Sequence, residues 1–320
     1  MRAYRLSSHE AAPEWSDIPV PQPGAGEIRV RIAACGLNFA DLLMMTGEYQ
    51  ATPALPFTLG MEVAGVVDAV GAEVSGFVPG DRVAVFGGQG GLAEFGCFDA
   101  TRAVAIPEAM SFVDAASFQI AYGTSHLALD HRARLQPGET LLVLGAAGGV
   151  GLTAVEIGKQ MGARVIACAR GAEKLEIAAK AGADHGIDAT EPDLRGALKA
   201  LGGVDVVYDP VGGAQFEAAF RACRPEARIL TIGFASGTVP QIKANHLLVK
   251  NISVLGVYWG GYLEFRPDVL TGSLATLMGW YEAGRIKPHV SHVLPMAEAG
   301  EGMALMRQRR STGKVVIEIA

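Results

Sequence analysis

A regular alternation of short apolar runs and amphipathic stretches, between residues 140 and 257, constrains the fold more than any other feature of the sequence. The apolar runs predict strands at TLLVLG (140–145), ARVIACA (163–169), a weak GID (186–188), VDVVYD (204–209), RILTIG (228–233) and ISVLGV (252–257). Helical patterns fill most of the intervals, for example 150–161, 173–181 and 215–223. Strands that alternate with helices are typical of βαβ crossovers. This region is therefore predicted to be α/β, with the doubly wound parallel sheet of a Rossmann domain.

The parts of the chain on either side have a different rhythm. In the first third, β-branched runs separated by Gly, Pro and Asp predict an antiparallel, β-rich domain with strands at 27–34, 61–71, 81–87 and 102–107. Helices are predicted at 39–45 and 114–130. The tail predicts helices near 268–284 and 297–309, and strands at 290–294 and 314–319. The closing strand can either complete the parallel sheet or return to the first domain.

Composition excludes several classes of protein. Half of the residues are hydrophobic and the net charge is −6, which gives no electrostatic reason to bind nucleic acid or an anionic membrane. The four cysteines are far apart and form no CxxC pair, which suits a reducing compartment. The N-terminus carries no apolar signal segment, and the longest uncharged run (140–155) is too short to span a bilayer. We therefore expect a cytoplasmic protein.

The strongest local signal is the glycine-rich turn after the first predicted strand of the α/β region. Gly145, Gly148, Gly149 and Gly151 lie between a strand and an amphipathic helix, and a second strand follows at 164. In a chain with 41 glycines the spacing alone carries little weight, so the strand–turn–helix context decides. Such a turn presents backbone N–H groups at a helix N-terminus, where a pyrophosphate can approach. A tight βα turn with no ligand is the alternative.

The end of the second strand of this region bears on the choice of dinucleotide. An NAD-binding unit places Asp or Glu there to accept from the ribose hydroxyls. Here the strand ends at Arg170, and Lys174 follows one helical turn later. Two cations in place of a carboxylate favour a 2′-phosphate, so NADPH is the predicted cofactor. Solvated surface charges are the alternative.

Several ordered motifs together resemble one family: CGLNFAD (35–41), GMEVAG (60–65), PGDRV (79–83), AAGGVG (146–151), DPVGG (209–213) and STGKVVI (311–317). From end to end the chain resembles the zinc-independent medium-chain dehydrogenases/reductases, the quinone oxidoreductase and enoyl reductase group. The resemblance implies a chaperonin-10-like, β-rich catalytic domain at 1–123 and 265–320. It also implies an inserted Rossmann domain at 124–264 and a homodimer.

Zinc is not expected. Zinc alcohol dehydrogenases of this superfamily carry Cys and His where this chain has Asn38 and Met61, and an amide and a thioether cannot replace thiolate and imidazole. His289 and His292 lack a third partner. Without a Lewis acid, the remaining chemistry is hydride transfer from the nicotinamide to an acceptor that is already electrophilic. A quinone or the β-carbon of an α,β-unsaturated carbonyl fits.

The resemblance also assigns roles to individual residues. Asn38, Asp41, Gly47 and Tyr49 match the N-x2-D-x5-G-x-Y pattern of enoyl thioester reductases, in which the Tyr is catalytic; a loop tyrosine that packs on a rim is the alternative. Asn38 is expected at the nicotinamide ribose or carboxamide, or else it is a turn amide. Thr124 is expected near the nicotinamide, with a helix-start cap as its competitor. Further cofactor contacts are expected at Ala147, Gly148, Gly149, Val150, Gly233 and Phe234.

Departures from the family pattern leave the acceptor open. Leu43 and Ala189 stand where typical quinone oxidoreductases have tyrosine, and Leu43 makes the expected pocket more apolar. Tyr258 and Trp259 either line a substrate cleft or pack in the core. An enoyl-CoA or acryloyl-CoA reductase is therefore one alternative. A protein that binds NADPH without catalysis is another.

Overall fold

The computed structural model describes residues 1–319, and contacts divide the chain into two compact units. Of the described residues, one unit contains Met1–Ile120 and 288–319, and the other contains Ala121–Lys287. The family resemblance implies these boundaries at 123/124 and 264/265. The second boundary lies later in the structure because α10 (Pro267–Glu282) packs on elements of the Ala121–Lys287 unit.

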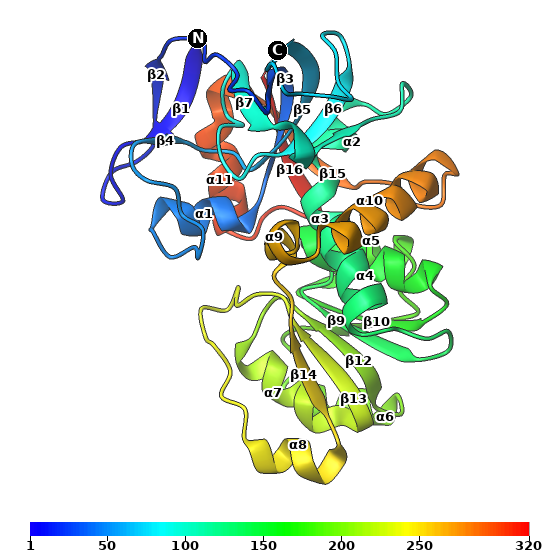
Figure 1. Ribbon diagram of the computed structural model, residues 1–320. Helices are drawn as coiled ribbons and strands as arrows, with labels where there is room; N and C mark the ends of the chain where they lie inside the picture. Colours follow the sequence, from blue (N-terminus) through cyan, green and yellow to red (C-terminus); the bar gives the residue numbers. More distant parts are fainter. Residues whose placement is uncertain (320) are drawn as a thin grey trace. The chain divides into compact units, whose positions relative to one another are not determined.

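The Ala121–Lys287 unit is built on a six-stranded parallel sheet, which confirms the predicted Rossmann arrangement (Figure 1). The strand order is β11-β10-β9-β12-β13-β14. The bounds are β9 (Thr140–Leu144), β10 (Arg164–Ala169), β11 (His185–Asp188), β12 (Val204–Asp209), β13 (Cys223–Thr231) and β14 (Ser253–Gly256). Every residue of β9 is buried, as expected for a central strand that helices cover on both faces.

Helices connect these strands and cover the sheet. The elements are α3 (Gln119–His126), the π-helical segment η2 (Leu127–Arg132), α4 (Gly149–Gln160), α5 (Ala172–Lys180), α6 (Leu194–Ala200), α7 (Gly213–Ala222), α8 (Ala244–Lys250), η3 (Trp259–Gly261), α9 (Tyr262–Phe265) and α10. An apolar core joins Leu198 of α6 and Phe216 of α7 to strand residues such as Leu142 and Val207. Within residues 1–319, no helix combines the length and apolarity needed to cross a membrane.

The other unit is β-rich, as predicted. Its larger sheet has the order β15-β16-β3-β5-β6-β8, with β7 also paired to β3, and a smaller sheet has the order β2-β1-β4. The strands are β1 (Arg2–Leu6), β2 (Glu14–Asp17), β3 (Glu27–Leu37), β4 (Phe57–Thr58), β5 (Glu62–Val70), β6 (Arg82–Phe86), β7 (Phe95–Asp99), β8 (Ala103–Ala105), β15 (Val290–Pro295) and β16 (Lys314–Glu318). The closing strand β16 pairs antiparallel with β3, so it returns to this unit.

Helices are few in this unit, and one predicted helix is divided. The elements are α1 (Phe39–Met45), η1 (Ala100–Arg102), α2 (Phe112–Ala116), η4 (Met296–Glu298) and α11 (Ala299–Arg307). The continuous helix predicted at 114–130 is wrong, because α2 ends at Ala116 and α3 begins at Gln119. The N–H and hydroxyl groups of Ser117 both donate to the Asp114 carbonyl, which ends α2.

Candidate active site

The glycine turn joins β9 to α4 at the carboxyl edge of the parallel sheet. Gly145 has a φ of +59°, a left-handed conformation that glycine adopts without steric strain. A Cβ at Gly151 would overlap the Gly145 carbonyl oxygen, so the helix can pack on the turn only with glycine there. Gly148 precedes the first residue of α4 and is exposed. The glycines therefore close the turn, expose its backbone and allow the helix to approach.

The glycine turn and the first residues of α4 offer unused hydrogen-bond donors. The first N–H groups of a helix have no intrahelical acceptor. Among residues 1–319, the N–H groups of Ala147, Gly149 and Val150 donate to no acceptor outside the helix. Val150 and Gly149 are partly exposed, and Ala147 is buried. This arrangement fits a pyrophosphate, because unused N–H donors and the positive end of the helix dipole both favour an anion.

Two neighbouring turns lie at the same edge of the sheet, beside the point where the strand order reverses between β9 and β12. Asp209 ends β12, and its Oδ1 accepts the N–H groups of Val211 and Gly212 at 2.8 Å each. Burial raises the pKa of Asp209, while these two N–H groups lower it. After β13, the Gly233 N–H donates to the Asp209 carbonyl at 3.3 Å, and Phe234 is 39% exposed. Dinucleotides bind at such a reversal point.

The predicted cations follow β10 at this edge. Arg170 is exposed directly after the strand, and Lys174 is half-buried in the first turn of α5. The sequence missed a carboxylate beside them: Asp188 ends β11, opposite Ala169, and its Oδ2 accepts the Gly171 N–H at 2.9 Å. Hydrogen bonds from the Thr190 hydroxyl, the Thr190 N–H and the Gly171 N–H lower the pKa of Asp188. Asp188 therefore supports the backbone that presents Arg170.

Thr124 lies inside α3 and is buried. The helix begins five positions earlier, at Gln119, so the alternative of a helix-start cap is wrong. The residue after Thr124, Ser125, anchors α3 to the first turn of α4, because its hydroxyl donates to the Val150 carbonyl at 2.9 Å. The same hydroxyl lies 3.0 Å from the Tyr208 hydroxyl of β12. The sequence did not single out Ser125, although it follows Thr124 directly.

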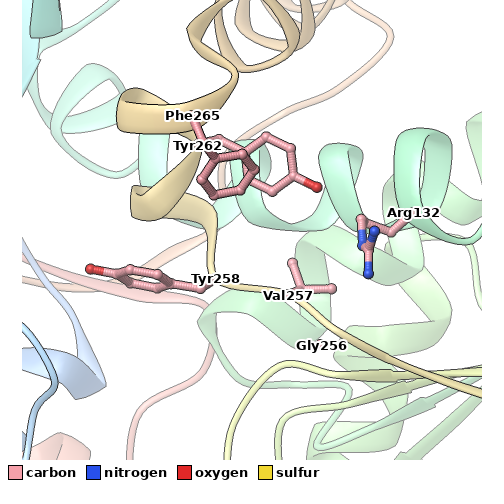
Figure 2. A pocket seen from close by; sticks show the side chains of 6 residues that line it. All are labelled: Arg132, Gly256, Val257, Tyr258, Tyr262 and Phe265. Atoms are coloured by element: carbon pink, nitrogen blue, oxygen red, sulfur yellow. The ribbon is translucent and has the colours of Figure 1, made fainter.

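A pocket of about 370 Å³ opens at the carboxyl end of β14 (Figure 2). Its lining residues are Arg132, Gly256, Val257, Tyr258, Tyr262 and Phe265. The rings of Tyr262 and Phe265 pack with centroids 4.6 Å apart, and Tyr258 is 43% exposed. Trp259 is 5% exposed and lies against Gly123. Of the two aromatic residues that the sequence left open, Trp259 is therefore part of the core, and Tyr258 is available to a ligand.

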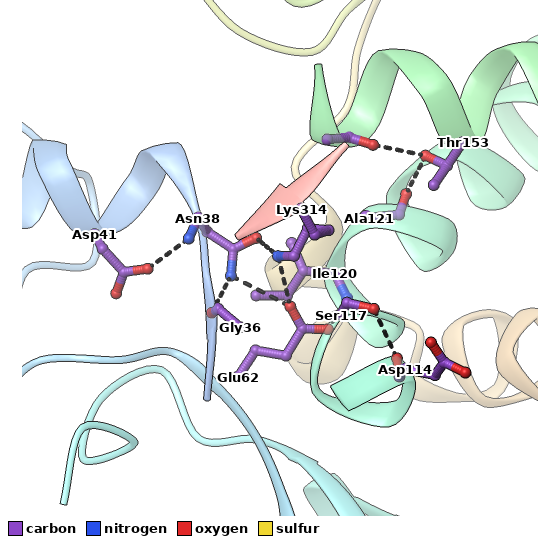
Figure 3. Close-up of polar contacts among 11 residues, drawn as sticks. Gly36, Asn38, Asp41, Glu62, Asp114, Ser117, Ile120, Ala121, Thr153 and Lys314 are labelled. Carbon is purple, nitrogen blue, oxygen red and sulfur yellow. Dashed lines mark hydrogen bonds and ion pairs between the residues drawn. The ribbon is translucent and has the colours of Figure 1, made fainter. Parts of the chain in front are cut away.

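Asn38 belongs to the other unit, where it precedes α1 and joins a buried polar cluster (Figure 3). Its Nδ2 donates to the Gly36 carbonyl at 3.1 Å and to Glu62 Oε2 at 3.3 Å. Its Oδ1 accepts from Lys314 Nζ at 2.7 Å, and Lys314 also contacts Glu62 Oε2 at 3.1 Å. Glu62 Oε1 accepts the Ile120 N–H at 2.9 Å. Asn38 is thus held by a buried ion pair that the sequence did not reveal.

Asp41 is also fully buried in this region. Its Oδ2 accepts the Asn38 N–H at 2.8 Å and its Oδ1 accepts the Gly60 N–H at 3.2 Å. Burial outweighs these hydrogen bonds and the Lys314 charge, so the pKa of Asp41 rises to about 6. Asp41 therefore fixes the start of α1 and titrates in the weakly acidic range.

Tyr49 lies half-buried in the turn after α1. Its carbonyl oxygen accepts the hydroxyl of Thr52 at 2.7 Å and the N–H of the same residue at 3.2 Å. Gly47, the glycine of the matching pattern, has a φ of +73°. These features define the backbone conformation of the turn. Tyr49 belongs to the same unit as Asn38 and follows it by eleven residues.

The positions that bind zinc in related alcohol dehydrogenases hold Asn38 and Met61, and Met61 is 3% exposed. His289 and His292 bond to hydroxyl groups, those of Thr312 and Ser291. No group of three or more His, Cys, Asp or Glu side chains suited to a metal ion occurs in the described part of the chain.

The predicted site residues thus fall into two sets. Asn38 and Tyr49 belong to the β-rich unit. The others gather in the Rossmann unit: Thr124, Ala147, Gly148, Gly149, Val150, Arg170, Lys174, Gly233 and Phe234.

Comparisons with known proteins agree with this architecture. The family model described as "Alcohol dehydrogenase GroES-like domain" matches residues 24–108, and that described as "Zinc-binding dehydrogenase" matches residues 149–272. The chain therefore belongs to the medium-chain dehydrogenase/reductase superfamily.

Within the superfamily, individual relatives narrow the group. The chain is 41% identical to quinone oxidoreductase-like protein 2 of Bos taurus over 297 residues, which cover 92% of this chain and 85% of that protein. The quinone oxidoreductase of Thermus thermophilus, solved also with NADPH, has a TM-score of 0.89 and 34% identity, with full coverage of both chains. The Escherichia coli quinone oxidoreductase complexed with NADPH has a TM-score of 0.92 and 29% identity, again with full coverage of both chains. The chain belongs to the quinone oxidoreductase group, as its motifs indicate.

Proposed function

We propose that this protein is an NADPH-dependent reductase that transfers hydride to a quinone or an α,β-unsaturated carbonyl compound without zinc. The observation that carries the proposal is the glycine turn at the start of α4. It exposes backbone N–H groups at the reversal point of the sheet, and Arg170 and Lys174 follow the adjacent strand. Solved relatives of similar fold are described as complexes with NADPH.

The residues of the chain fit this cofactor. The N–H groups of Ala147, Gly149 and Val150 would hold the pyrophosphate, and Arg170 with Lys174 would hold the 2′-phosphate. Asn38 would contact the nicotinamide nucleoside, and Thr124 would lie near the nicotinamide. Gly233 and Phe234 would also contact the cofactor. When bound, NADPH supplies a hydride from carbon 4 of its nicotinamide ring.

The donor set supports chemistry without a metal. The Asn38 amide oxygen already faces the Lys314 ammonium group at 2.7 Å, and Met61 offers only a thioether, so neither suits Zn²⁺. An unactivated carbonyl would then lack a Lewis acid, whereas a quinone or enone needs only alignment and a proton donor. Tyr49 is the proposed donor, because its phenol can hydrogen-bond a developing enolate oxygen.

A cofactor titration followed by an acceptor screen tests the proposal. The purified protein should bind NADPH more tightly than NADH and should oxidise NADPH in the presence of a simple quinone or enone. Faster turnover of crotonyl-CoA than of any quinone would reassign the chain to enoyl-CoA reduction. Tight NADPH binding without turnover of quinones, enones or enoyl-CoA esters would contradict an enzymatic role.

We further propose a cytoplasmic homodimer. The cysteines are all free thiols, which suits the cytoplasm. β14 is an edge strand of the six-stranded sheet, and α8 nearby exposes Leu248 (77%) and Val249 (75%). An open edge beside apolar side chains favours pairing with a second copy. Replacing both residues with Glu should convert a dimer to a monomer in light scattering; a monomer before replacement would refute the assembly.

A further inference from the structure

The register of the larger β-rich sheet brings three residues from distant parts of the chain together. β16 pairs antiparallel with β3 so that Val315 lies opposite Leu37, and one step further along this register Lys314 faces Asn38. β5 pairs with the other side of β3, where Glu62 lies opposite Gly36. Backbone pairing thus places Asn38, Glu62 and Lys314 next to one another, and all three side chains are buried.

The hydrogen bonds of the cluster determine the orientation of the Asn38 amide. An ammonium group only donates, and a carboxylate only accepts. The atom 2.7 Å from Lys314 Nζ must therefore be Oδ1, and the atom that faces Glu62 Oε2 and the Gly36 carbonyl must be Nδ2. A flipped amide would place its NH₂ group against the ammonium and its oxygen against two acceptors.

This orientation limits what Asn38 can bind. Both hydrogens of Nδ2 are engaged, so the amide has no donor left. Oδ1 uses one lone pair for Lys314 and keeps a second, because the neighbouring Asp41 N–H donates to the Asn38 backbone carbonyl at 3.0 Å instead. Asn38 retains 9% exposure, whereas Lys314 retains 5% and Glu62 none. The Asn38 side chain can therefore form a further hydrogen bond only as an acceptor.

We propose that Lys314 and Glu62 are positioning residues that fix Asn38 as a hydrogen-bond acceptor for the nicotinamide nucleoside. The proposal rests on the proposed binding of NADPH. The group that Asn38 recognises is then a donor, a ribose hydroxyl or the carboxamide NH₂, and it is not the carbonyl oxygen of the acceptor substrate. Without both Lys314 and the Glu62 carboxylate, only the Gly36 carbonyl orients the amide. A rotated amide then presents its NH₂ group to the donor that it should bind.

The test compares variants in two backgrounds. Lys314→Met alone leaves the buried Glu62 carboxylate without its cation, so the double variant Glu62→Gln with Lys314→Met removes both charges. Lys314→Arg keeps a cation at the same place. Each change is made in the unaltered chain and in Asn38→Ala, and NADPH affinity, kcat and the melting temperature are measured for all.

We expect the double variant to weaken NADPH binding by about tenfold or more, as for the loss of one hydrogen bond. Lys314→Arg should stay within about threefold, a smaller loss than that bond. In the Asn38→Ala background the double change should alter NADPH affinity by less than about twofold, because the residue it positions is already gone. A merely structural role would lower the melting temperature and change NADPH affinity equally in both backgrounds.

A folded double variant with unaltered NADPH affinity would overturn this inference, and so would an equal loss in both backgrounds. Failure of the unaltered protein to bind NADPH would overturn the proposed function, and this inference with it. NADPH binding by the unaltered protein therefore distinguishes the two failures.

Discussion

Replacement of Asp41 by Asn should change how the stability of the protein depends on pH. The Asp41 carboxyl is fully buried, and burial raises its pKa from 3.8 to about 6. The folded protein therefore holds this proton more tightly than the unfolded chain does. The resulting stabilisation is complete below about pH 4 and is lost as the pH rises through about 6.

The size of the effect follows from the shift. A rise from 3.8 to about 6 is roughly two pKa units at about 1.4 kcal/mol each, so the group contributes about 3 kcal/mol that is present in acid and absent at neutral pH. About 2 kcal/mol of this change falls between pH 4.5 and pH 8. Asn also accepts with only one oxygen, so one of the N–H groups of Asn38 and Gly60 loses its partner at every pH.

Urea denaturation of the two proteins between pH 4.5 and pH 8 measures the prediction. The stability advantage of the unaltered protein over Asp41→Asn should shrink by about 2 kcal/mol as the pH rises, since other groups contribute equally to both. Asp17→Asn, at an exposed carboxyl, controls for the loss of one negative charge. An advantage that grows with pH would refute the reasoning. It would mean that the hydrogen bonds from the Asn38 and Gly60 N–H groups lower the pKa of Asp41 more than burial raises it.

Three further predictions concern the proposed site. Arg170→Ala with Lys174→Ala should weaken NADPH binding by about tenfold or more and leave NADH binding unchanged, because only NADPH carries a 2′-phosphate; equal losses in fluorescence titrations would contradict the assignment. Gly148→Ala should weaken NADPH binding and lower the melting temperature less than Gly151→Ala, because a Cβ at Gly148 lies 3.3 Å from the Gly145 carbonyl oxygen and one at Gly151 overlaps that oxygen; the reverse order would exclude these roles. Tyr49→Phe should reduce kcat by about tenfold or more at unchanged NADPH affinity, and near-normal turnover would remove the phenol from the mechanism.

Much of the fold was predictable because it rests on local periodicity. The α/β region has apolar runs at strand length and helical patterns between them, and each predicted strand there overlaps an observed one. The helix at 39–45 has the bounds that the sequence indicated. The helix predicted at 114–130 failed because the break at Ser117 depends on one local hydrogen-bonding choice, which apolar periodicity does not reveal.

The candidate site divides in the same way. The glycine turn and the cations after β10 follow from a few consecutive residues, so the sequence placed them. The contact between Asn38 and Lys314 joins positions 276 residues apart, and it depends on the register of β16 against β3. A single sequence does not fix which strands pair, and for the same reason it left open whether the closing strand returns to the first unit. Asp188 was missed because its strand has a weak pattern and its partner lies on the neighbouring strand.

The most direct measurement is NADPH oxidation by purified protein that has been treated with a metal chelator, with its metal content determined in parallel. Metal-free protein should oxidise NADPH when a quinone or enone is added and should not oxidise simple alcohols. Activity that disappears on chelation and returns with Zn²⁺, together with oxidation of alcohols, would contradict the account.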